Sequence, residues 1–406
     1  MEYQTHTLTN GLRFIHLRMN GPVSHAALMV NTGSRDEKED EQGIAHFIEH
    51  VIFKGTSRRK AYHIISRLED VGGEINAYTA KEETCIHASF MTEYMPRALE
   101  LFSDIFFNSV FPAKELEKEK EVILDEINSY QDTPSEQIFD DFDEQVFINH
   151  PLGRNILGTE ESLQSFNREK VIQFIEANYF TDDMVLCTIG NLDFQKVLYY
   201  AEKYFSSFPA RLKDRTRLPF SSYQPTLKKF EKDTYQSHCL LGRTAYSIHD
   251  TRRTGLYLLS NWLAGPGLNS RLNLQLREKH GFVYSVESTY TPYTDTGLFS
   301  IYFGTDKENL KKSVRIIQKE LNQLRDKKLG EIQLHKAKKQ LIGQLAIAAE
   351  NLINQNLSMA KSYLVFDKVD SLEEINRKIE AVTASELLEV ANEIMVFDEL
   401  STLIYE

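Results

Sequence analysis

The chain has 406 residues, with 47 Lys or Arg against 59 Asp or Glu, which gives a formal net charge of −12. An acidic balance of this size disfavours nucleic acid and anionic membrane as partners, because both carry negative charge. No apolar run approaches the roughly 20 residues that a membrane-spanning helix needs, so no membrane segment is expected. The length allows two or three domains, each large enough to bury its own core.

Hydrophobic periodicity and turn signals predict alternating strands and helices through the first half of the chain. A hairpin is expected around Asn10-Gly11, a strong turn signal, and Gly72-Gly73 is expected to end a helix. The elements that we expect are strands at 7–9, 12–17, 26–30 and 185–190, an extended stretch at 75–90, and helices at 43–54, 61–71, 96–108 and 115–127.

The stretch from 209 to 232 is polar and interrupted by prolines, which is typical of a connection between domains. We therefore predict a first domain at 1–212, a linker at 213–232 and a second domain at 233–406. Similar elements recur after the linker in similar order, which indicates an internal duplication although few residues are identical. The expected elements there are strands at 239–243, 283–290 and 298–303, and helices at 255–264, 270–280, 307–325 and 334–345.

The cysteines and the N-terminus indicate the compartment. Cys85, Cys187 and Cys239 are odd in number and widely spaced, which argues against a disulfide framework and favours a reducing environment. The first residues have neither the basic nor the apolar region of a secretory signal. We therefore expect a cytoplasmic protein whose cysteines are buried apolar thiols.

The most informative motif is His46-Phe47-Ile48-Glu49-His50. Two histidines four residues apart lie one turn apart on the same face of a helix. Neutral imidazole is a good zinc ligand, and a carboxylate at Glu49 can take a proton from a water on the same ion. This is the H-x-x-E-H order of the inverzincins. The alternative is a pair of surface histidines on an amphipathic helix.

A catalytic zinc needs three protein ligands and one open position, so another element must supply the third ligand. The acidic helix expected at 115–127 carries Glu119 and Glu126, which are seven residues apart and share one face. Each could equally be a solvated surface glutamate. The residues alone leave this choice open.

Almost the whole chain resembles the pitrilysin family of zinc metallopeptidases, in the branch of short bacterial proteins similar to the β subunit of mitochondrial processing peptidase. The segments that match the family, besides the histidine motif, are Gly43-Ile44-Ala45, Phe53-Lys54-Gly55-Thr56, Asn76-Ala77-Tyr78-Thr79, His150-Pro151-Leu152-Gly153 and Ile156-Leu157-Gly158-Thr159. The resemblance implies an α+β fold of two similar domains, each an antiparallel sheet packed with helices.

The resemblance also implies roles for individual residues. His46, His50 and Glu126 match the zinc ligands, and one zinc per chain is expected because the second half has no H-x-x-E-H. Glu49 matches the general base, and Glu119 matches a glutamate that supports the ligands. The residues expected to bind substrate are Asn76 and Ala77, on an edge strand, and Phe47.

In the second half, Arg277 and Tyr284 match an arginine and a tyrosine that reach the substrate and the oxyanion in catalytic relatives. The alternative is a surface arginine and an ordinary strand tyrosine. Long members of the family enclose a chamber with four such domains, whereas this chain has two. The resemblance therefore implies a homodimer in which this pair acts in trans, on the zinc site of the other subunit.

The implied function is that of a zinc-dependent endopeptidase that cleaves unfolded peptides inside a closed clamshell chamber. Water activated by zinc would be the nucleophile, with Glu49 as general base. Two alternatives remain, a non-catalytic or regulatory peptide-binding subunit of a heterodimeric relative and a module that sequesters peptides. A zinc hydrolase of non-peptide substrates has no supporting feature in the sequence.

Overall fold

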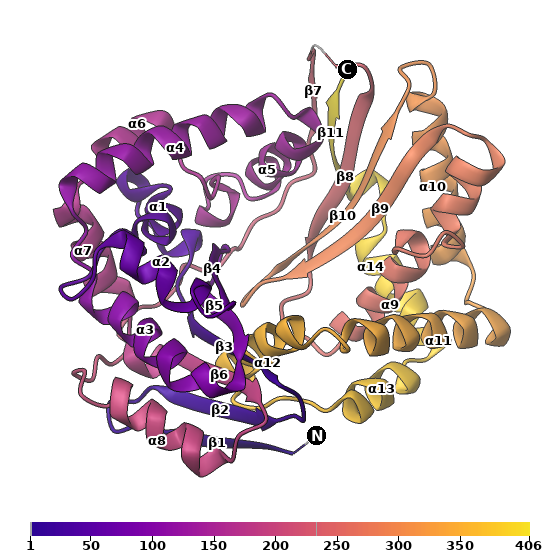
Figure 1. Ribbon diagram of the computed structural model, residues 1–406. Coiled ribbons are helices and arrows are strands. Elements are labelled where there is room, and N and C mark those ends of the chain that lie inside the picture. The colour runs from indigo at the N-terminus through magenta and orange to yellow at the C-terminus, as the bar shows by residue number, and fades with distance from the viewer. Residues whose placement is uncertain (1, 233) are drawn as a thin grey trace. The chain divides into compact units, whose positions relative to one another are not determined.

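The computed structural model describes residues 2–232 and 234–406, which form two compact units (Figure 1). The first unit contains the chain up to Asn128, with Arg154–Arg217 and Ile347–Ser371. The second contains Ser129–Gly153, Leu218–Ala346 and Leu372–Glu406. These units differ from the continuous domains expected at 1–212 and 233–406, because each includes a segment from the other half of the sequence.

The first unit is built on a six-stranded sheet with the order β1-β2-β6-β3-β5-β4. Its strands are β1 (Tyr3–Thr7), β2 (Arg13–Arg18), β3 (Val23–Val30), β4 (Glu74–Thr79), β5 (Thr84–Met91) and β6 (Met184–Gly190). β2 and β6 run parallel, and the other neighbouring pairs are antiparallel. Asn10-Gly11 makes the expected turn between β1 and β2, with Gly11 at a φ of 92°.

Helices cover both faces of this sheet. They are α1 (Ile44–Val51), α2 (Ala61–Glu69), α3 (Met95–Asn108), α4 (Ala113–Gln131), α6 (Glu160–Ser165), α7 (Arg168–Asn178), α8 (Phe194–Phe205) and α12 (Leu352–Phe366). Alternate strand residues point to opposite faces. Phe14 and Leu28 therefore join one core with α1, α3, α7 and α8, whereas Ile15 and Met29 join another with α12.

The second unit is built on a five-stranded sheet with the order β7-β11-β8-β10-β9. Its strands are β7 (Leu227–Phe230), β8 (Ser237–Ala245), β9 (Val283–Pro292), β10 (Gly297–Thr305) and β11 (Ser401–Tyr405). Its helices are α5 (Pro134–Val146), α9 (Arg253–Ala264), α10 (Leu310–Asp326), α11 (Glu331–Ala348), α13 (Leu372–Ala381) and α14 (Ala384–Ile394). Asn273–Lys279 is a π-helix, where the sequence predicts an ordinary helix over 270–280.

The two sheets share one topology, which confirms the predicted fold of two similar α+β units related by duplication. In chain order, β2 to β6 correspond to β7 to β11. Each sheet has one parallel pair, β2 with β6 or β7 with β11, and continues antiparallel to an edge strand, β4 or β9. The helix that carries the histidine motif, α1, therefore corresponds to α9.

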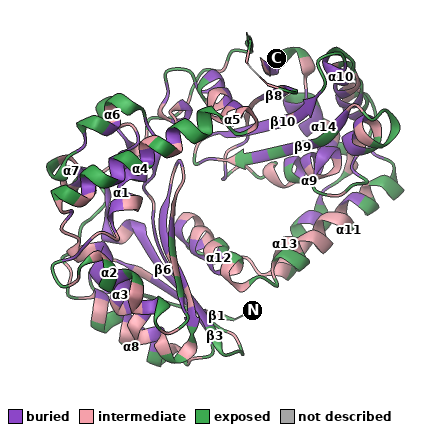
Figure 2. Ribbon diagram, turned by 45° about the horizontal axis from the view of Figure 1, so that its top comes forward, coloured by how far each residue is buried: buried purple, intermediate pink, exposed green. Residues whose placement is uncertain are grey.

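Each unit takes one helix from the opposite half of the sequence. α5 packs against β8 and β11, where Phe142 joins a core with Leu240. α12 packs against β3 and β6, where Met359 and Leu364 complete a core. Figure 2 shows that the inner strands of both sheets are largely buried, with β6 buried along its whole length. The exchanged helices supply apolar cover that each sheet needs on one face.

The predicted linker at 213–232 is held at both ends. The guanidinium of Arg217 forms two hydrogen bonds to Asp36 of the first unit, at 2.9 and 2.8 Å. Further along, β7 pairs with β11 in the second unit. The polar composition indicates that this segment has no core of its own, but it does not reveal these anchors.

Two observations concern the expectations drawn from composition. Cys85, Cys187 and Cys239 are buried and free, and burial raises the pKa of the Cys187 thiol above its usual range. Such thiols behave as small apolar side chains. Within residues 2–232 and 234–406, no helix combines the length and the apolar character needed to cross a bilayer.

Candidate metal centre

Helix α1 is apolar except for one polar face. Gly43, which precedes it, has a φ of 91° and lets the chain turn sharply into the helix. The residues of α1 that anchor it in the core are Ile44, Ala45, Ile48 and Val51. The helical repeat then gathers His46, Glu49 and His50 on the opposite face.

Phe47 does not lie on that face. Its side chain is 0% exposed and packs against the ring of Phe166, with the ring centroids 5.4 Å apart. The expectation that Phe47 binds substrate is wrong, because one residue beyond His46 the helix turns its side chain into the core.

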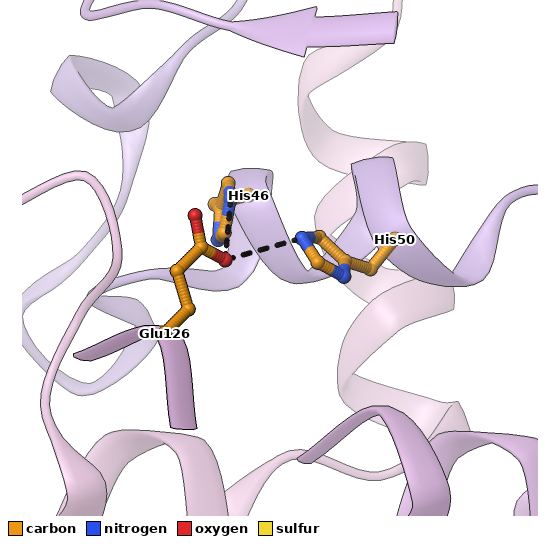
Figure 3. Close-up of side chains that lie close together, drawn as sticks. All are labelled: His46, His50 and Glu126. Atoms are coloured by element: carbon orange, nitrogen blue, oxygen red, sulfur yellow. Dashed lines mark ion pairs between the residues drawn. The ribbon is translucent and has the colours of Figure 1, made fainter. Parts of the chain in front are cut away.

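Helix α4 brings Glu126 to the two histidines (Figure 3). One carboxylate oxygen of Glu126 lies 3.5 Å from Nε2 of His50 and 3.8 Å from Nε2 of His46. The ligand atoms of the three residues lie within 4.8 Å of one another. Zinc bonds of about 2.0–2.2 Å in a tetrahedron place ligand atoms roughly 3.3–3.6 Å apart. Two imidazoles and a carboxylate at these distances fit a zinc ion.

Glu119 supports His50 from the side away from Glu126. Its Oε2 is 3.3 Å from Nδ1 of His50, and its Oε1 is 2.7 Å from Nζ of Lys54. A hydrogen bond donated by Nδ1 leaves the lone pair of Nε2 free, which is the tautomer that metal binding requires. Lys54 was given no role from the sequence, and its place in the segment Phe53-Lys54-Gly55-Thr56, which matches the family, is the signal that could have identified it.

Burial and neighbouring charges set the ionisation of the ligand residues in the protein without metal. Burial is the main cause that lowers the pKa of His46 to about 4, and His50 adds to the effect. Burial alone would also lower the pKa of His50, but the hydrogen bonds and charge of Glu126 and Glu119 outweigh it and raise the pKa. The hydrogen bond with His50 holds the pKa of Glu126 below its usual range. At neutral pH, His46 therefore offers a neutral ring and Glu126 an anionic oxygen, the forms that bind zinc.

Glu49 interacts with Thr79 of the edge strand β4. Burial raises the pKa of Glu49, while a hydrogen bond with Thr79 of β4 and the charge of His50 oppose the rise. Thr79 also donates a hydrogen bond to the carbonyl of Ala45 in α1, at 3.4 Å. Thr79 thus joins the edge strand to the helix that carries the candidate ligands.

Asn76 and Ala77 lie on β4 as expected, at the edge of the six-stranded sheet. Asn76 is exposed, and its Oδ1 accepts a hydrogen bond from the backbone of Ala77 at 2.8 Å. The side chain of Ala77 faces the core. What this strand offers to a ligand is therefore its backbone edge rather than a side-chain pocket.

Arg277 and Tyr284 lie together in the second unit. The guanidinium of Arg277 is 5.6 Å from the centroid of the Tyr284 ring, a cation–π arrangement. Tyr284 is 80% exposed at the start of β9, and Gly281, with a φ of 62°, forms the turn before it. Arg277 belongs to the π-helix. Such wide helical turns are rare in proteins, and those that occur often lie at functional sites.

His46, Glu49 and His50 follow the H-x-x-E-H order of the inverzincins, and Glu126 lies beside the two histidines. Residues 15–160 match the family model described as insulinase (peptidase family M16), and residues 165–341 match the one described as peptidase M16 inactive domain. The chain belongs to peptidase family M16, which confirms the resemblance read from the sequence.

Relatives of similar length support this membership. The chain is 34% identical to the uncharacterized zinc protease YmxG of Bacillus subtilis (strain 168), over 98% of this chain and 97% of that one. It is 34% identical to an uncharacterized zinc protease of Rickettsia felis, over 97% of this chain and 95% of that one. The crystal structure of a protease from Helicobacter pylori has the same fold, with a TM-score of 0.91 at 22% identity, over 100% of this chain and 99% of that one.

Proposed function

We propose that this protein is a zinc-dependent endopeptidase that cleaves unfolded peptides. The observation that carries the proposal is the convergence of His46, His50 and Glu126 from two helices, with Glu49 on the same face of α1. The names of the relatives, which are zinc proteases, support the same activity. The second matched model, which is described as an inactive domain, covers residues 165–341, where the motif is absent. This match supports one zinc per chain.

His46, His50 and Glu126 would hold the metal, and Glu119 would keep His50 in the binding tautomer. Bound zinc would supply a Lewis acid that polarises the scissile carbonyl and makes a water acidic enough to ionise near neutral pH. Glu49 takes the proton of the attacking water and returns it to the leaving amine. In the protein without metal, burial raises the pKa of Glu49, which favours the uptake of a proton over its release.

The substrate would bind as an additional strand along β4. Backbone hydrogen bonds at Asn76 and Ala77 would supply affinity with little selectivity for sequence, with the peptide taking the place of the Asn76 side chain at the N–H of Ala77. Only an extended chain can pair in this way, so a folded protein would have to unfold before it could be cut. This argument supports an endopeptidase of unfolded peptides.

Arg277 and Tyr284 would act on the bound peptide, with Tyr284 donating a hydrogen bond to the developing oxyanion. Tyr284 is 80% exposed, so packing does not explain its presence, and its contact with Arg277 supports a role of the pair in binding a ligand. We propose that two chains form a homodimer with a closed chamber, and that the pair acts in trans on the metal centre of the other subunit.

Substitution of Glu49 tests the enzymatic function. Glu49→Gln should keep zinc and peptide binding but lower turnover of a quenched peptide by roughly 10²-fold or more, because proton transfer is removed while the ligands remain. Glu121→Gln, on the exposed face of α4, is the control. If wild type binds zinc and peptide without cleaving, the protein is a peptide-binding subunit and not an enzyme.

Mixing tests the arrangement in trans. Glu49→Gln and Tyr284→Phe chains, each nearly inactive, should regain roughly a quarter of wild-type activity after subunit exchange, because half of the dimers are mixed and each has one intact site. Demonstrated exchange without recovery would mean that each site is built within one chain.

A further inference from the structure

The start of α1 has no capping side chain of its own. The first backbone N–H groups of a helix have no partner within the helix and need acceptors from elsewhere. Ser, Thr, Asp or Asn at the N-cap is the usual source, but the N-cap here is Gly43, which makes no side-chain hydrogen bond.

The side chain of Glu37, which lies before the helix in the sequence, supplies hydrogen-bond acceptors for two of these N–H groups. Its Oε2 accepts a hydrogen bond from the backbone N–H of Gly43, and its Oε1 accepts one from the backbone N–H of Ala45, each at 2.9 Å. The side chain of Glu37 is 4% exposed. One buried carboxyl group thus ties the residue before α1 to the residue that precedes His46.

Close packing explains why the cap comes from outside the helix. A Cβ at position 43 would stand 2.6 Å from Cα of Gly158 and 2.7 Å from the carbonyl of Leu157, so a capping side chain at Gly43 has no room. The backbone of Glu37 is fixed as well, since Nη1 of Arg154 donates to its carbonyl at 2.7 Å. Gly43 and Glu37 are therefore held against the same loop.

The two histidines differ in how they are supported. Nδ1 of His50 hydrogen-bonds to Glu119, which orients the ring. Nδ1 of His46 is buried and, within the described residues, has no hydrogen-bond partner. The position of His46 therefore depends on the backbone of the first turn of α1, which is the part that Glu37 holds.

We infer that Glu37 is a positioning residue for the metal centre, which fixes the first turn of α1 so that His46 meets Glu126. This inference rests on the proposed function. Burial, the largest influence, raises the pKa of Glu37 to about 8 against the two N–H groups, Arg154 and Lys81. Burying a carboxyl group costs free energy, and here it caps only one short helix. We therefore expect this cap to serve the position of the helix more than the stability of the fold.

The test compares Glu37→Gln with Glu41→Gln in the full-length protein loaded with Co²⁺. An amide in place of the carboxyl group keeps the shape but turns one acceptor into a donor that faces an N–H. Glu41 accepts a hydrogen bond from the backbone of Lys38 in the same segment at 3.0 Å and is the matched control. Glu37→Gln should weaken Co²⁺ binding about 10- to 100-fold and change the visible absorption spectrum of the bound ion. At saturating metal it should lower kcat and leave KM unchanged. Glu41→Gln should match wild type.

The outcomes separate this inference from the proposed function. Wild type that takes up no Co²⁺ overturns both. If wild type binds Co²⁺, a Glu37→Gln protein with wild-type affinity and spectrum, even at a lower melting temperature, overturns the positioning role alone. Should Glu37→Gln fail to fold, Arg154→Met serves instead, because it keeps the carboxyl group but removes the hydrogen bond that holds the backbone of Glu37 and a positive charge that acts on the carboxyl group. A smaller shift in the same spectrum is then expected, and an unshifted spectrum overturns the inference.

Discussion

Substitutions in the two exchanged helices should weaken the sheet that each helix covers, rather than the sheet that is nearer in sequence. Leu364→Ala removes a buried side chain of α12 that packs with Ile15 and Met29 of the first unit. Phe142→Ala removes a buried side chain of α5 that packs with Leu240 of the second unit. Each variant is the control for the other.

The packing of these side chains gives the size of the effect. Truncation of a buried Leu to Ala costs about 2–5 kcal/mol, and truncation of a buried Phe costs about 3–5 kcal/mol. A loss of about 2 kcal/mol from the free energy of local opening corresponds to roughly 30-fold faster hydrogen exchange. We expect at least this acceleration in β3 and β6 for Leu364→Ala, and in β8 and β11 for Phe142→Ala.

Hydrogen exchange followed by mass spectrometry on peptides from the four strands measures this directly. The reasoning is refuted if Phe142→Ala accelerates exchange in β3 and β6 while β8 and β11 stay protected. It is also refuted if both variants affect all four strands equally, because the exchanged helices would then have no unit of their own.

Four further results are expected at the metal centre. His50→Ala should reduce zinc, measured by elemental analysis, far below one ion per chain, and an undiminished content would exclude the proposed ligands. Lys54→Met removes the cation beside Glu119 and should weaken zinc binding about 10-fold in a chelator competition. An unchanged dissociation constant would mean that Glu119 orients His50 without help from Lys54. Because the pKa of His50 is raised, the metal-free site still holds a proton at pH values above 6.5, the ordinary pKa of histidine. Zinc affinity should therefore increase with pH, by about tenfold per unit below that raised pKa, and a flat profile from about pH 6 to 8 would contradict this. In the same metal-free protein, the stability gained from protonated His50 should be complete below pH 6.5 and lost as pH rises through the raised pKa.

Local signals made the metal helix and its neighbours predictable from sequence. The histidine spacing indicates a helix, which was expected over 43–54, and α1 spans Ile44–Val51. The stretch at 75–90 was expected as one extended segment but is the hairpin of β4 and β5. The residues of its turn, Ala80 to Glu83, include no glycine, proline, asparagine or aspartate, so the usual turn signal is missing.

Contacts between distant segments were not predictable. An amphipathic pattern indicates that α5 and α12 each bury one face, but it does not indicate which sheet receives that face. The arginines of the expected linker look like solvated charges in the sequence, and only the fold shows that Arg217 pairs with Asp36. For the same reason, the sequence gives no signal that Glu37 caps α1.

The position of α12 in the chain has a consequence for synthesis on the ribosome. The strands and the candidate ligands of the first unit are translated early, but the helix that covers one face of their sheet is translated only after β10, α10 and α11. Until then, the apolar residues of β3 and β6 on that face have no cover from α12. The first unit therefore cannot complete its core during synthesis of its own half, and the nascent chain should depend on chaperones or on a slow final docking step.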